Sequence, residues 1–108
     1  MSEHDNCHVD PVEKPLDREA IQSAVVAYLQ VTGMGCPNCA MRVHNGLLGL
    51  EGVLAAEVAL EHGLAAAAFD PERVNVEGLI QAVAGAGNDG RHHYVARLLK
   101  QVPASEAL

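Results

Sequence analysis

The stretch VTGMGCPNCAMRV, residues 31–43, is the starting point for predicting the fold. It places Cys36 and Cys39 three residues apart, between a β-branched run and a run with helical spacing. Glycines break the strand signal before the pair, and Pro37 suits the first position of a helix, where its missing N–H would have no partner in any case. The two cysteines are therefore expected at a strand-to-helix turn.

The segments on both sides of this turn predict the order β-α-β-β-α-β. Apolar residues alternate in the strand segments, whereas Val43 and Leu47 follow the spacing of a buried helical stripe. Asn75 is a suitable N-cap for the second helix. The predicted strands cover residues 23–32, 53–60, 64–69 and 93–99. This order is that of an α+β, ferredoxin-like sandwich, a four-stranded antiparallel sheet with two helices on one face.

The face of the predicted sheet that points away from the helices is smooth and apolar. Its strands carry small side chains there, at Ala55, Ala59, Ala66 and Ala68. Two interpretations are open. Either an exposed sheet simply tolerates small residues, or the N-terminal segment, the C-terminal tail or a second copy of the chain contacts this face.

Length and composition predict one domain. The chain has 108 residues and is 49% hydrophobic but only 3% aromatic, so its core must consist mainly of Ala, Val, Leu and Ile. Residues 1–22 are acidic and lack a periodic apolar signal, which predicts a flexible N-terminal extension. We expect the folded domain over residues 23–100 and a C-terminal tail over residues 101–108.

Charge and hydropathy exclude several classes of partner. The formal net charge of −7 argues against nucleic acid and anionic membranes, because neutralising phosphate requires clustered Lys and Arg. No apolar run is long enough for a signal peptide or a membrane span, so no membrane insertion is expected. Three cysteines do not make a disulfide framework, which favours a reducing, cytoplasmic location.

A cysteine pair at a helix start has a definite chemistry. Unpaired backbone N–H groups and the positive end of the helix dipole favour the thiolates of Cys36 and Cys39. Two thiolates suit a soft ion that accepts two ligands, Cu(I) first and Hg(II) next, whereas Zn(II) would require four ligands. A thioredoxin-like thiol–disulfide oxidoreductase and ordinary structural cysteines are the alternatives, although the chain lacks the tryptophan usual before the first cysteine of thioredoxins.

Two longer segments carry a family resemblance. GMGCPNCAMRVHNGLLGLEGV, residues 33–53, resembles the G-M-x-C-x-x-C signature of heavy-metal-associated domains, which occur in copper chaperones, P-type metal ATPases and mercury-binding proteins. FDPERVNVEGLIQAVAGAG, residues 69–87, is similar to the Asp-Pro, Leu-Ile and Ala-Gly pattern of the same family. The resemblance covers roughly residues 24–99 and agrees in order and spacing in both halves.

The resemblance implies that Cys36 and Cys39 bind the metal ion and that Met34 packs beneath the loop. It implies a carrier rather than an enzyme, which passes the ion by ligand exchange to a metal-transporting P-type ATPase or another cysteine-bearing acceptor. Gly35 stands where zinc-exporting relatives tend to have an acidic residue, which favours Cu(I), with Hg(II), Zn(II) and Cd(II) as alternatives. Asn88 stands where a typical member has an aromatic residue near the metal, which leaves selectivity open.

Other soft or borderline ligands are candidate auxiliary residues: His4, Cys7, His8 and His93. The first three lie together near the N-terminus, and an extended segment of about 15 residues spans roughly 50 Å, enough to reach the cysteine turn. His93 is predicted at the same end of the sheet as that turn. These residues either complete the site or are incidental. Two exposed thiolates also allow a metal-bridged dimer, so the chain is expected to be a monomer or such a dimer.

Overall fold

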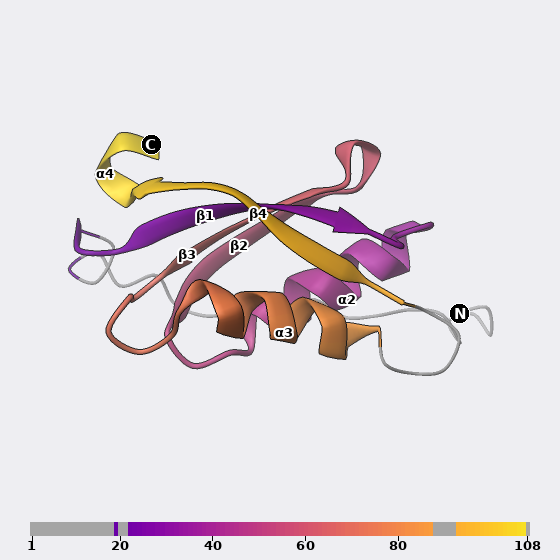
Figure 1. The fold of residues 1–108 in the computed structure, drawn as a ribbon, viewed down its shortest axis with the longest axis horizontal. Helices are drawn as coiled ribbons and strands as arrows, with labels where there is room; N and C mark the ends of the chain where they lie inside the picture. Colours follow the sequence, from indigo (N-terminus) through magenta and orange to yellow (C-terminus); the bar gives the residue numbers. More distant parts are fainter. Residues whose placement is uncertain (1–18, 20–21, 88–92, 108) are drawn as a thin grey trace, which may run out of the picture.

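The structure, a computed structural model, describes residues 19, 22–87 and 93–107. Within these residues, four strands form one antiparallel sheet in the order β2-β3-β1-β4, and helices α2 and α3 lie side by side on one of its faces (Figure 1). The elements are β1 (Val25–Thr32), α2 (Pro37–Leu48), β2 (Val53–Ala59), the 3₁₀ turn η2 (Leu60–His62), β3 (Leu64–Phe69), α3 (Val76–Ala86), β4 (Val95–Pro103) and α4 (Ala104–Ala107). The predicted ferredoxin-like sandwich is confirmed.

Strand β1 is the organising element of the sheet, because it pairs with β3 on one side and β4 on the other. Its residues alternate between the two faces, and Ala27, Leu29 and Val31 point into the buried core beneath the helices. Small and branched aliphatic side chains make up most of this core, as the composition predicts. Phe69 and Tyr94 are its buried aromatic residues.

Single residues explain where the two helices start and how closely they pack. Pro37 occupies the first turn of α2, and the Gly78 N–H donates to Asn75 Oδ1 at 2.9 Å, which confirms the predicted N-cap of α3. A Cβ atom at Gly46 would lie 3.1 Å from the Ala82 carbonyl oxygen, so glycine lets α2 approach α3 closely. The longest helix in the described part of the chain is α2, with 12 residues, which is too short to cross a membrane.

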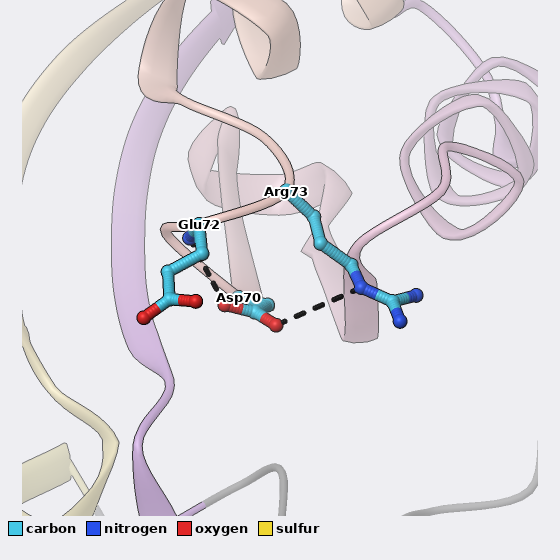
Figure 2. A network of polar contacts seen from close by, with 3 residues as sticks. All are labelled: Asp70, Glu72 and Arg73. Atoms are coloured by element: carbon cyan, nitrogen blue, oxygen red, sulfur yellow. Dashed lines mark hydrogen bonds and ion pairs between the residues drawn. The ribbon is translucent and has the colours of Figure 1, made fainter.

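The Asp-Pro segment forms the turn between β3 and α3 (Figure 2). The Glu72 N–H donates to Asp70 Oδ1 at 2.9 Å, and Arg73 Nε lies 3.8 Å from Asp70 Oδ2. The Asp70 N–H donates to the Gly52 carbonyl at 2.8 Å, which ties the turn to the start of β2. Because β3 runs antiparallel to β1, this network lies at the end of the sheet opposite the cysteine turn, where it supports the fold.

The structure corrects the predicted C-terminal boundary at residue 100. Strand β4 starts two residues later than predicted and runs on to Pro103, with Gln101 opposite Ala27 on β1. A register shift at Tyr28 allows this pairing to continue. Residue Ala104 of α4 is then buried against the outer face of the sheet, so the segment predicted as a tail is part of the fold.

Candidate metal centre

The cysteine turn is held in place by a close contact with His93, in the segment that leads into β4. Gly33 has φ +102, and a Cβ atom there would lie 2.0 Å from the His93 carbonyl oxygen. Only glycine fits both the backbone conformation and the space. Met34 is partly buried against the core, as the family resemblance implies. The chain therefore enters α2 from a turn that is fixed on one side.

The two cysteines lie at the start of α2 but in different surroundings. Cys36 is the N-cap residue, has extended backbone angles, makes no side-chain capping bond and is half-buried. Cys39 lies in the first turn and is only 2% exposed. Their Sγ atoms are 3.2 Å apart, well beyond the roughly 2.05 Å of a disulfide bond, and both are free thiols. The predicted pair is thus brought together, with one sulfur anchored in the core and the other accessible.

Opposing effects set the pKa of the Cys39 thiol. Burial raises it, but hydrogen bonds from the Tyr94 side chain and the Gly35 backbone lower it, and bonds from Cys36 lower it further. The net result is a pKa of about 7, below the ordinary 9.0. Near neutral pH, about half of the Cys39 side chains are therefore thiolates, the form that binds metal ions.

The structure places Tyr94 beside the cysteines, a role that no sequence motif indicated. Its side chain is 2% exposed, and its ring lies so close to Gly87 that a Cβ atom there would be 2.6 Å from it. Burial raises the pKa of Tyr94, and the nearby Cys39 raises it further, so the phenol stays protonated and can donate to the sulfur. Asn88 stands at the sequence position where a typical member of the family has an aromatic residue. In this chain Tyr94, further along the sequence, provides an aromatic hydroxyl at the site. In the sequence, the signal that could have indicated this role of Tyr94 is its place as a single tyrosine at the start of the last apolar strand.

The auxiliary ligands stay predictions. His93 lies at the same end of the fold as the cysteine turn, with an exposed side chain. No three His, Cys, Asp or Glu side chains converge to hold a metal ion anywhere in residues 19, 22–87 and 93–107. His4, Cys7 and His8 lie outside the described residues.

Comparisons with known proteins agree with this geometry. Copper chaperone CopZ of Bacillus subtilis (strain 168) is 38% identical over 61 residues, which are 56% of this chain and 88% of CopZ. Copper-transporting ATPase RAN1 of Arabidopsis thaliana is 33% identical over 75 residues, which are 69% of this chain but 8% of the ATPase. The chain thus spans most of the chaperone and a small part of the transporter.

Solved structures show the same fold. The crystal structure of a copper binding domain from HMA7, a P-type ATPase, matches with a TM-score of 0.65 and 31% identity, over 71% of this chain and 96% of that domain. Oxidized MerP from Ralstonia metallidurans CH34 matches with a TM-score of 0.62 and 29% identity, over 71% of this chain and all of that one. The family model for the heavy-metal-associated domain matches residues 28–89. The chain belongs to the heavy-metal-associated domain family.

Proposed function

We propose that the chain binds one Cu(I) ion through Cys36 and Cys39 and passes it on by ligand exchange. The observation that carries this proposal is the pair of free sulfurs, 3.2 Å apart at the start of α2, one of which has a pKa of about 7. Two such thiolates match the preference of soft Cu(I) for sulfur. The copper chaperones and copper-transporting ATPases among the relatives support the same assignment.

Binding requires only a small movement of one ligand. Metal–sulfur bonds of about 2.3 Å hold two sulfurs at most about 4.6 Å apart, so the pair, now 3.2 Å apart, opens by no more than about 1.4 Å. Cys36 is the residue that can move, because it makes no capping bond and is half-buried, whereas Cys39 is fixed in the core. The same accessibility makes Cys36 the ligand that an incoming thiolate displaces first.

The choice of metal follows from the number of ligands. Zn(II) in structural sites has four protein ligands, and no third His, Cys, Asp or Glu joins the pair within the described parts of the chain. Cu(I) needs no more than the two sulfurs. Hg(II) and Cd(II) are also thiophilic and are the competing ions, together with Zn(II) if further ligands come from a partner.

Transfer needs an acceptor with cysteines of its own. A metal-transporting P-type ATPase is the proposed partner, because the HMA7 copper binding domain, which belongs to a P-type ATPase, shares this fold. We place this exchange in the cytoplasm, where reducing conditions keep both thiols free. The reaction is ligand exchange without a covalent change in any substrate, so the proposal describes a carrier and not an enzyme.

The test is an anaerobic Cu(I) titration against a competing chelator. The full chain should bind one ion, and Cys36→Ser or Cys39→Ser should each weaken binding by at least about 100-fold, as expected for loss of one of two ligands. Cys7→Ala is the matched control, and unchanged binding would leave the N-terminal cysteine outside the site. Chelator-competitive binding that survives both serine variants, or none in the native chain, would refute the proposal.

A thiol–disulfide oxidoreductase is the second candidate, because a thiol pKa of about 7 and a close second thiol also suit disulfide exchange. Catalytic turnover of a disulfide substrate without metal would favour it. Under the carrier proposal, the chain should react with such a substrate once and then stop.

A further inference from the structure

The outer face of the sheet carries an ordered row of four side chains, one from each strand. Glu57 on β2 is opposite Ala66 on β3, Ala66 is opposite Tyr28 on β1, and Tyr28 is opposite Lys100 on β4. Across the sheet the row therefore reads acidic, small, large and basic. The binding of metal at the cysteine turn does not use any of these residues.

The charged ends of the row are exposed and available. Lys100 Nζ lies 5.3 Å from the centre of the Tyr28 ring, so the ammonium group is held over the face of the sheet. Glu57 is exposed and has no ion-pair partner within residues 19, 22–87 and 93–107. The face thus has a negative edge on β2 and a positive edge on β4.

Between these edges lies an open apolar groove with a cavity volume of about 910 Å³. Besides the row, it is lined by Leu64 and Leu99, which are 38% and 48% exposed. Helix α4 lies on this side of the sheet but covers another part, where Ala104 packs on Val26 and Ala68 (Figure 1). A protein surface rarely leaves a large apolar groove of this kind without a partner.

We propose that a second copy of the chain binds this face, related by a two-fold axis parallel to the strands. Such an axis reverses the order of the strands, so that β2 lies over β4 of the second copy and β3 lies over its β1. Glu57 then faces Lys100 of the second copy, and Tyr28 faces its Ala66. When the order of the row is reversed in the second copy, acidic meets basic and large meets small at every position. This self-complementarity in charge and size is what a symmetric interface requires. Aligned packing of two sheets about 10 Å apart is a common arrangement.

This dimer differs from one bridged by a metal ion. An axis parallel to the strands leaves both cysteine turns at the same end of the dimer and outside the interface. A shared ion would instead bring the two cysteine ends against each other. The proposed dimer should therefore form in the absence of metal, and the double variant Cys36→Ser with Cys39→Ser should also dimerise.

The test is sedimentation velocity of the full chain over a range of concentrations, with reductant and a metal chelator present. We expect a concentration-dependent shift from the monomer to twice its mass. Glu57→Lys and Lys100→Glu should each raise the dissociation constant about tenfold, because each places like charges opposite one another at two symmetric positions. The double variant Glu57→Lys with Lys100→Glu restores opposite charges and should return to within about threefold of the native value. Glu51→Lys, an exposed change elsewhere of the same charge, should have no effect on the dimer.

Four results would overturn the proposal. A native chain that stays monomeric up to about 500 μM does not use this face for self-association. Single variants that dimerise like the native chain, or a double variant as weak as the single ones, would contradict the proposed pairing. NMR spectra identify another occupant: if the amide signals of Tyr28 and Ala66 do not change on dilution but change on deletion of residues 1–22, that segment and not a second copy binds the groove.

Discussion

Replacing Tyr94 by Phe isolates the hydrogen bond that supports the Cys39 thiolate. The ring would still fill its place against Gly87, so the fold should persist while the hydroxyl is lost. A hydrogen bond to a charged group contributes about 1.5–3 kcal/mol, and one pKa unit corresponds to 1.36 kcal/mol. The pKa of Cys39 should therefore rise by about 1–2 units from its value of about 7.

The measurement is the ¹³Cβ chemical shift of Cys39 as a function of pH in the metal-free protein, which follows the thiol titration by NMR without requiring access of a reagent to this buried sulfur. The matched control is Tyr28→Phe, which removes the hydroxyl of a tyrosine on the opposite face of the sheet. It should leave the titration of Cys39 unchanged. If Tyr94→Phe also titrates within about 0.3 units of the native protein, the hydroxyl does not support the thiolate and the electrostatic account of the site fails.

The remaining predictions concern stability, each measured by urea unfolding in reductant. Folding lowers the pKa of Cys39 from 9.0 to about 7, so the unfolded chain binds more protons between these pH values. The free energy of unfolding of the metal-free protein should therefore rise by up to about 2 kcal/mol from pH 7 to pH 9, and this contribution is lost as pH falls through 7. A free energy of unfolding that does not depend on pH would contradict this. Gly33→Ala should cost at least about 2 kcal/mol, since the added methyl group meets the His93 carbonyl and φ is positive; a near-native value would show that the turn can shift freely. Asn75→Ala should cost about 1 kcal/mol through the lost cap of α3 and leave Cu(I) affinity unchanged, because the cap lies at the far end of the fold from the cysteines; altered affinity would contradict that separation.

Local signals explain why most of the fold could be predicted. Alternation over β3 identifies Ala65, Ala67 and Phe69 as the inward side chains, and each is buried. The cap at Asn75 needs only the three residues that follow it. The cysteine pair was identified by its spacing, and its place at the start of α2 followed from Pro37. Each of these features depends on neighbours in sequence.

The features that were missed depend on contacts between distant residues. The end of β4 is an exposed edge strand with polar residues such as Lys100 and Gln101, so it shows no alternating burial, and its pairing depends on the register shift at Tyr28. The contact between Tyr94 and Cys39 joins residues 55 positions apart in the sequence. A sequence pattern does not show which strand end a distant side chain meets.

Strand β1 links the two surfaces to which we assign functions. Its C-terminal end leads into the cysteine turn, its odd-numbered residues such as Leu29 fill the core, and Tyr28 lies at the centre of the outer face. The cysteine turn lies at an end of the sheet, whereas the charged row lies on a face, so a partner could reach one without covering the other. If both proposals hold, a dimer would present two Cu(I) sites side by side at one end, and charge variants at Glu57 should change the assembly without changing the affinity of either site. A matching loss of Cu(I) affinity in those variants would show that the two surfaces are coupled, and the independence argued from their positions on β1 would be wrong.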